Sequence, residues 1–212
     1  MFENLYIGQY AFYEPPEDNP AASPKLDYVE PLFKRRLSQL SRMTIEVIRQ
    51  VKDTAPDAKT VFASSRGEIG RQVKINRGLV DEFAILPAQF SLSVFNTPPA
   101  VATIALGMKN GYTAVYPGEG RLYDAFVCAV APILAGDENQ VIFVYGDELI
   151  PEEYAPILTA REKAAVPFAF AVVISKENRP GAIPVPDSIV TKSAEDFLSY
   201  LKERKKSDGR AE

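Results

Sequence analysis

The chain has 212 residues, of which 46% are hydrophobic and 25% charged, and its formal net charge is −4. That length suffices for one large domain with a buried core, and the composition is that of an ordinary globular protein. The acidic balance argues against a nucleic-acid-binding protein, which usually presents a basic face. No apolar run approaches the roughly 18 residues of a membrane span, and the acidic start does not resemble a secretory signal. We therefore expect a cytoplasmic protein without membrane contact.

Two residue types restrict the chemistry further. The sequence contains no histidine and a single cysteine, Cys128. A Ser-His-Asp triad, a Cys-His pair, a His-ligated metal and an internal disulfide are thereby excluded. We expect neither a metal nor a cofactor.

Strands and helices are predicted to alternate through the first half of the chain. Segment 4–13 is aromatic and nearly alternating, which is typical of a strand, and the prolines that follow it exclude a helix. Apolar residues then recur at spacings of three and four over 31–53, which predicts one amphipathic helix. A short buried strand is predicted at 60–64, followed by a weaker helical pattern over 68–82.

The second half continues this alternation. Segment 87–96 alternates apolar and polar residues, which predicts a strand with Phe90 and Leu92 on one face and Phe95 on the other. The remaining predictions are helices at 98–107, 121–134 and 193–206, the last capped by Ser193, and strands at 112–116, 140–145 and 168–175.

The alternation of these elements favours an α/β fold. Strands rich in Val, Ile and Phe on both faces are typical of a parallel or mixed sheet that is covered by helices. No internal repeat or linker is evident, so we interpret residues 1–212 as a single domain.

Few residues outside the core patterns suggest chemistry. Cys128 lies mid-helix among apolar residues with nothing to lower its pKa, so we interpret it as a small buried hydrophobe. Arg35 and Arg36 are most simply a solvated helix face, although they suit an acidic partner.

Two acidic features have both a functional and a simpler interpretation. The turn 117–120 joins a buried strand to a buried helix, where several α/β enzymes hold their nucleophile, but here it carries Glu119. Glu119 also suits the positive end of a helix. The pairs Asp147–Glu148 and Glu152–Glu153 follow a strand and suit acid–base or metal chemistry, yet a solvated loop is the simpler interpretation.

Four segments in this order resemble one known family. They are RRLSQLSRMTIEVI (35–48), FASSRGEIGRQVKI (62–75), AQFSLSVFNTPPAVATIALGMKNGYTAVYPGEGRLYDAFVCAVAPIL (88–134) and VIFVYGDELIPEEY (141–154). Over about residues 28–175 the chain resembles the β-ketoacyl synthase-like chain length factor family. The resemblance implies the first half of the thiolase-like fold. It also implies a non-catalytic partner of a ketosynthase in polyene or fatty-acid-like biosynthesis.

The resemblance also assigns residues. The cysteine of active ketosynthases falls on Glu119, and the small residue after it in the helix falls on Ala125. Active members also need two histidines from the second half of the fold, and this sequence has neither the histidines nor that half. Relatives tend to carry histidine where this chain has Phe95, which puts a polar role at that position in doubt. We therefore expect no condensing activity.

The implied partner is a catalytic ketosynthase, paired across a pseudo-two-fold axis along strand 112–116. This subunit would then close one end of the partner's acyl tunnel, and we expect Phe95 and Tyr116 to face it. The candidates for tunnel and interface are Phe90, Leu92, Phe95, Asn96, Thr113, Val115 and Tyr116.

Two other interpretations remain open. The chain could be an enzyme that uses Glu119 or the pair Asp147 and Glu148. Alternatively, it could be a scaffold that keeps the half-fold and docks an acyl carrier protein.

Overall fold

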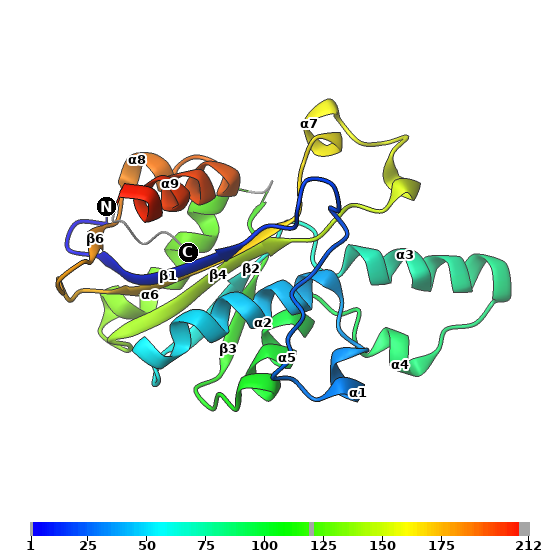
Figure 1. The fold of residues 1–212 in the computed structure, drawn as a ribbon, viewed down its shortest axis with the longest axis horizontal. Helices are drawn as coiled ribbons and strands as arrows, with labels where there is room; N and C mark the ends of the chain where they lie inside the picture. The colour runs from blue at the N-terminus through cyan, green and yellow to red at the C-terminus, as the bar shows by residue number, and fades with distance from the viewer. Residues whose placement is uncertain (1, 119–120, 208–212) are drawn as a thin grey trace.

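The computed structural model describes residues 2–118 and 121–207 and contains one mixed sheet between two layers of helices (Figure 1). Its strand order is β3-β2-β4-β5-β1-β6. The strands are β1 (Tyr6–Tyr13), β2 (Lys59–Ala63), β3 (Tyr112–Val115), β4 (Gln140–Asp147), β5 (Phe168–Ser175) and β6 (Ile183–Pro184).

Strand directions divide the sheet into two parts. β2 pairs in parallel with both β3 and β4, whereas β5 is antiparallel to β4 and to β1, and β1 is antiparallel to β6. The predicted mixed sheet covered by helices is thus confirmed. β3 forms one edge, because within the described residues it pairs with β2 alone.

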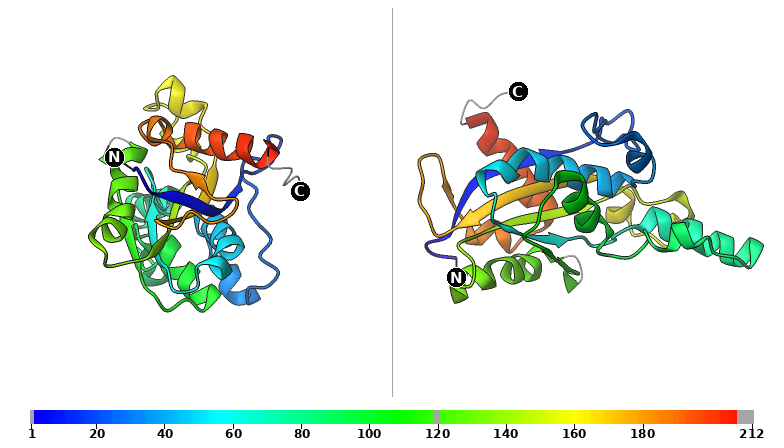
Figure 2. Two further views of the ribbon diagram at one scale, coloured as in Figure 1. Left: turned by 90° about the vertical axis from the view of Figure 1, so that its left-hand side faces the viewer. Right: turned by 90° about the horizontal axis from the view of Figure 1, so that it is seen from below.

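Helices cover both faces of the sheet (Figures 1 and 2). One face carries α2 (Gln39–Val51) and α5 (Thr97–Leu106); the other carries α6 (Leu122–Ala135), α8 (Asp187–Val190) and α9 (Ala194–Ser207). Four short helices lie at one end of the sheet: α1 (Pro31–Lys34), α3 (Ile69–Arg77), α4 (Pro87–Phe90) and α7 (Ala160–Lys163). Single turns occur at Lys52–Thr54, Gly78–Glu82 and Glu152–Tyr154.

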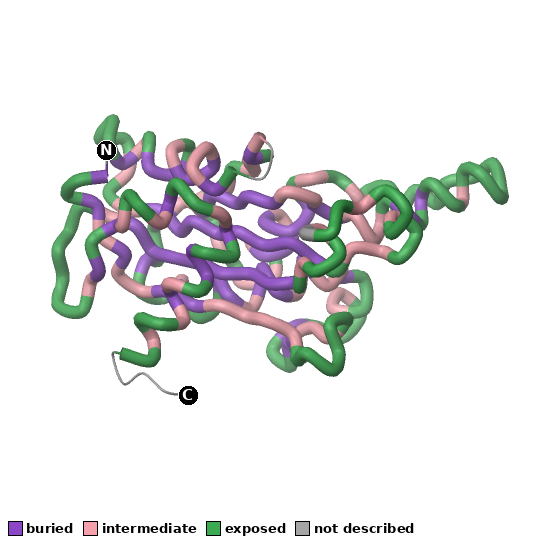
Figure 3. The backbone as a smooth tube through the Cα atoms, turned by 90° about the horizontal axis from the view of Figure 1, so that it is seen from above, coloured by how far each residue is buried: buried purple, intermediate pink, exposed green. Residues whose placement is uncertain are grey.

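Successive side chains of each strand point to opposite faces of the sheet and contribute to two different cores. Phe168 and Phe170 of β5 face α6 and α9, where Phe170 packs against Phe197 with ring centroids 5.1 Å apart. Ala169 and Ala171 face α2, and their small side chains leave room for the large apolar residues of that helix. The buried stretches of the backbone are therefore concentrated in the central strands (Figure 3).

Residues 69–94 form an arm that extends away from this body (Figures 2 and 3). It contains α3, a π-helical turn at Gly78–Glu82 and α4. Several of its apolar side chains are exposed, among them Phe83, which is 91% accessible.

The predicted helix over 31–53 is wrong as a continuous element. It is divided into α1 and α2, because Ser38 takes an extended conformation and caps α2 through an Oγ that accepts from the Ser41 N–H at 3.0 Å. A side-chain oxygen that satisfies a free N–H at a helix start favours a new helix over continuation. Periodicity alone does not reveal this break.

The predicted strand over 87–96 is also wrong. Pro87 opens the four-residue helix α4, and the Phe90 N–H donates to the Leu86 carbonyl at 3.2 Å. The following turns bring Leu92 and Phe95 to the same core, on the side of α2. Their predicted placement on opposite faces is therefore wrong as well.

Two further expectations about helices have different outcomes. Ser193 caps α9, since its Oγ accepts from the Asp196 N–H at 3.1 Å, as predicted. Cys128 is exposed on α6, so the expected burial is wrong. Among the described helices, none combines the length and the apolar character needed to cross a membrane.

Candidate functional site

The three mutually parallel strands β2, β3 and β4 end at the same edge of the sheet. The loop 64–67 follows β2, Tyr116 follows β3, and Asp147 ends β4. The elbow predicted from the sequence connects β3 to α6, and its described residues are Pro117, Gly118 and Arg121. Glu119, the predicted nucleophile position, lies outside the described residues.

Asp147 organises the loop after β2. Its Oδ1 accepts from the Ser64 hydroxyl at 2.7 Å and from the backbone N–H groups of Ser65 and Arg66 at 3.0 and 3.1 Å. The Tyr145 hydroxyl contacts Ser65 Oγ at 2.5 Å and donates to Asp147 Oδ2 at 3.3 Å. This carboxylate fixes the backbone beside the elbow.

Burial governs the protonation of this cluster. Loss of solvation raises the pKa of Asp147, an effect opposed first by the Ser64 hydrogen bond. Burial and the neighbouring Asp147 charge raise the pKa of Tyr145, so its phenol stays protonated near neutral pH. The cluster therefore offers hydrogen-bond donors and acceptors, among them the protonated Tyr145 phenol.

A cavity of about 750 Å³ lies over this cluster. Its walls come from the loop after β2, from segment 159–165 and from residues 191–196 at the start of α9. Tyr116 and Arg121, which flank the elbow, complete the wall. The residues on either side of the elbow therefore line a space large enough for a small ligand.

Most of the predicted interface residues lie together at the edge of β3. The Phe95 ring packs between Phe62 and Tyr116, with centroids 6.1 and 6.2 Å away. Asn96 donates from Nδ2 to the Tyr112 hydroxyl at 3.2 Å. The Tyr116 side chain is 63% accessible and lines the cavity described above.

The other predicted residues are placed as follows. Thr113 is exposed and Val115 half-buried on β3. Leu92 is half-buried near Phe95, whereas Phe90 is exposed on α4. Both residues belong to the arm, but Leu92 packs against the core on the side of α2, whereas Phe90 is exposed on α4.

The expectation that Asp147 and Glu148 belong to a solvated loop is wrong. The two residues are 4% and 5% accessible. Glu148 serves a second cluster, since its Oε1 accepts from the Gly70 N–H at 2.8 Å and its Oε2 from the Leu40 N–H at 3.3 Å. The strand end buries both carboxylates because helices α2 and α3 begin beside it.

Glu68 is the second carboxylate of that cluster. Its Oε1 accepts from the hydroxyls of Ser38 and Ser41, each at 2.7 Å, and its Oε2 accepts from Arg71 Nε at 2.9 Å. Burial and the Glu68 charge raise the pKa of Glu148 to about 7, and burial also raises the pKa of Glu68. The Glu68–Glu148 pair therefore changes charge near neutral pH.

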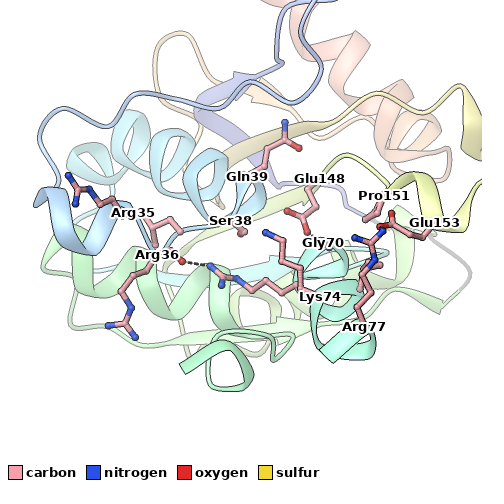
Figure 4. A pocket seen from close by; sticks show the side chains of 13 residues that line it. Arg35, Arg36, Ser38, Gln39, Gly70, Lys74, Arg77, Glu148, Pro151 and Glu153 are labelled. Carbon is pink, nitrogen blue, oxygen red and sulfur yellow. Dashed lines mark hydrogen bonds and ion pairs between the residues drawn. The ribbon is translucent and has the colours of Figure 1, made fainter. Parts of the chain in front are cut away.

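A pocket of about 390 Å³ adjoins this pair (Figure 4). Lys74 points into it from α3, whereas Arg35 and Arg36 extend outward from its rim. Arg77 lines the pocket and forms an ion pair with Glu153. Within the described residues, no cluster of three or more acidic or cysteine side chains is arranged to hold a metal ion.

The sequence from residue 11 to residue 206 matches the model of the beta-ketoacyl synthase N-terminal domain. The chain belongs to this family. No match was found among curated proteins.

Solved structures share the fold of this ketosynthase-family chain. One is the ketosynthase ApeO in complex with its chain length factor ApeC from Xenorhabdus doucetiae, with a TM-score of 0.67 and 24% identity; the match covers 82% of this chain and 79% of that one. Another is a beta-ketoacyl synthase from Burkholderia phymatum, with a TM-score of 0.55 and 11% identity over 74% of this chain. A third is the ishigamide ketosynthase/chain length factor, with a TM-score of 0.50 and 12% identity over 79% of this chain. The match covers 46% and 49% of the latter two chains. These likenesses establish the thiolase-like fold.

Sequence analysis missed the residues that hold the loops at this edge. Ser38, Ser41, Ser64 and Glu68 gave no pattern, because their partners are distant in the chain. The one usable signal was the position of Asp147 and Glu148 directly after a buried strand. In open α/β sheets ligands bind at the carboxyl ends of the strands, so carboxylates in this position are candidates for a site.

Proposed function

We propose that this chain is a non-catalytic chain length factor, a single ketosynthase-like domain that pairs with a catalytic ketosynthase and shapes its acyl tunnel. One observation carries the proposal. The only cysteine of this ketosynthase-family chain, Cys128, is exposed on α6 six residues after the first residue of that helix, Leu122. It does not stand at the elbow where the family fold presents its nucleophile.

The chemistry supports this reading. Condensation needs a thiolate that carries the acyl group and donors that stabilise the enolate formed when carbon dioxide leaves. The chain contains no histidine, and the elbow carries Glu119. A carboxylate at that position would oppose the negative charge of the enolate.

The edge of β3 supports pairing with another subunit. An unpaired strand edge is a ready template for another strand. β3 itself carries the half-buried Val115 and the exposed Thr113, and the helix α5, which contacts β3, carries the exposed Ile104. We propose that the partner ketosynthase pairs with this edge.

Phe95 and Tyr116 are the proposed tunnel residues. Both lie next to the elbow, and Tyr116 lines the cavity beside it. Aromatic side chains at this place would limit the length of an acyl chain that enters from the partner. We do not extend this role to Phe90, because it lies on the arm.

Complex formation tests the pairing. We expect the chain to co-sediment with its ketosynthase as a heterodimer and Val115→Lys to weaken that complex. Ile157→Lys, a change of similar chemistry at a 77% accessible site in the loop after β4, is the matched control. Equal affinity of both variants, each with the thermal stability of the wild type, would contradict the proposed interface.

A second function is favoured by a separate observation. Arg35, Arg36 and Lys74 form no ion pair within the described residues, although the whole chain is acidic. A basic rim of this kind suits an acidic partner such as an acyl carrier protein. The double variant Arg35→Glu, Arg36→Glu should weaken carrier protein binding and leave the ketosynthase complex intact. Unchanged carrier binding at low salt would eliminate this candidate.

A further inference from the structure

Glu68 and Glu148 join three separate parts of the chain at the root of the arm. Glu68 opens α3 and binds Ser38 and Ser41 at the start of α2. Glu148, after β4, accepts from the Gly70 N–H of α3 and the Leu40 N–H of α2. We call these two residues the carboxylate clasp.

The carboxylates of the clasp are packed closely against the first turns of α2 and α3. A Cβ at Gly70 would lie 3.3 Å from Glu148 Oε1, so the carboxylate sits directly against the α3 backbone. Ser38 uses one hydroxyl both to cap α2 and to donate to Glu68. A change in the clasp therefore acts on the first turns of both helices.

The clasp is also next to a proposed tunnel residue. Gly67, which precedes Glu68, has a φ of +57°, and a Cβ there would lie 2.9 Å from the Phe95 ring. The arm thus leaves the body at Glu68 and returns to it at Phe95. The position of the Phe95 ring depends on the backbone that the clasp holds.

Charge at the clasp is not balanced when both carboxylates are ionised. From α3 the clasp faces Arg71, which binds Glu68, and Lys74, which lines the same pocket. From the other elements it faces the hydroxyls and N–H groups of α2, while the neighbouring Asp147 is turned toward Ser64. The other charged groups that line the pocket are Arg35, Arg36, Arg77 and Glu153. Within the part of the chain that the structure describes, Arg71 is thus the one cation in direct contact with the clasp, and it contacts Glu68.

We propose that Glu68 and Glu148 are positioning residues that fix the arm and the Phe95 ring, and that the arm loosens when both carboxylates carry a negative charge. The effect on product length rests on the proposed function. The effect on the arm does not, because it is a property of this chain alone.

Hydrogen exchange of the full chain tests the effect on the arm. With Glu148 titrating at about 7, we expect exchange of the amides in 69–78 to speed up about tenfold between about pH 6 and about pH 8, after correction for the intrinsic rate. Glu148→Gln keeps an oxygen for the Gly70 N–H and carries no charge, so its corrected exchange should not change with pH. Glu153→Gln, at the same pocket, should keep the tenfold change.

A second variant allows the same test if Glu148→Gln does not fold. Glu68→Gln removes the like charge, so the corrected change between the same two pH values should fall below about twofold. A flat wild-type profile, or a tenfold change that persists in both clasp variants, would overturn the proposal.

Product length then tests the link to Phe95. In the complex with the ketosynthase, the product distribution should differ between the two pH values for wild type and not for Glu148→Gln. If exchange behaves as expected and Phe95→Ala leaves the products unchanged, the proposed function fails and the clasp stands. If Phe95→Ala shifts the product lengths and the corrected hydrogen exchange of the wild type does not change with pH, the proposal for the clasp is wrong and the proposed function stands.

Discussion

The central sheet and the arm contain similar apolar residues, which are buried in the sheet and in part exposed on the arm. Phe143 on β4 is fully buried between two helical layers, whereas Phe83 on the arm is almost fully exposed. In the central strands, apolar residues form continuous runs, and other parts of the chain cover both faces of these strands. On the arm, Phe83 ends a π-helical turn in a left-handed conformation, and none of the described residues buries its side chain. An apolar sequence pattern therefore predicts burial only where another part of the chain covers the residues.

The largest effect should come from the sheet. Phe143→Ala removes a ring that packs 5.5 Å from Phe126 and 6.2 Å from Phe170, measured between centroids. We expect it to lower the free energy of unfolding by about 3–5 kcal/mol. Urea denaturation of the isolated chain measures this. A loss below about 1 kcal/mol would mean that the two regions do not differ as described.

The second-largest effect on the free energy of unfolding should come from a change in pH. Glu148 has a pKa of about 7 in the folded chain and an ordinary value of 4.5, so the folded chain holds more protons between these values. Stability from this group is complete below about pH 4.5 and is lost as the pH rises through about 7. We expect the free energy of unfolding to fall by about 2–3 kcal/mol from about pH 5 to about pH 8.

The control for this pH effect is the Glu148→Gln variant. Its free energy of unfolding should depend less on pH than that of the wild type. Glu68 and Asp147, whose pKa values are also raised, act in the same direction and leave a smaller slope. Stability that rises with pH over this range in the wild type would contradict the assignment.

Phe95 lies between the two regions and should show an intermediate effect. It is half-buried against Phe62, so Phe95→Ala should cost about 1–2 kcal/mol, less than a fully buried phenylalanine. The space it opens admits methylenes that each gain about 0.8 kcal/mol on burial, so products of the ketosynthase complex should be longer. Product length and unfolding are measured on the same variant. A loss of about 3–5 kcal/mol with unchanged products would make Phe95 a core residue only.

The smallest effect should come from the arm. Phe83→Ala removes a ring that contacts almost nothing, and we expect a change within about 0.5 kcal/mol in the isolated chain. Thermal unfolding beside Phe143→Ala gives the direct comparison. A clear destabilisation would show that the arm is packed in solution.

These contrasts explain what could be predicted from the sequence. The strands at 60–64, 140–145 and 168–175 are predicted within a few residues, because burial on both faces leaves runs rich in Val, Ile and Phe. The strand at 112–116 is also predicted, although it lies at the edge of the sheet and is only partly buried. Helix α5 was also located, with Gly107 as its left-handed end.

The errors have physical causes. Segment 87–96 has the alternation of a strand, but Pro87 opens a short helix there and the segment does not join the described sheet. The burial of Glu68, Asp147 and Glu148 depends on hydroxyls and N–H groups from distant segments, which no local pattern reveals. Most of the edge residues predicted from the family resemblance do lie together, because the order of elements around the elbow brings them there.

Carbon–carbon bond formation tests the central claim most directly. The purified chain, its Glu119→Cys variant, the ketosynthase partner and the mixture of chain and partner are each given acyl and malonyl thioesters. We predict no condensation by the chain or by Glu119→Cys, since no histidine is present to assist, and condensation by the mixture. Condensation by the purified chain alone would contradict the non-catalytic role.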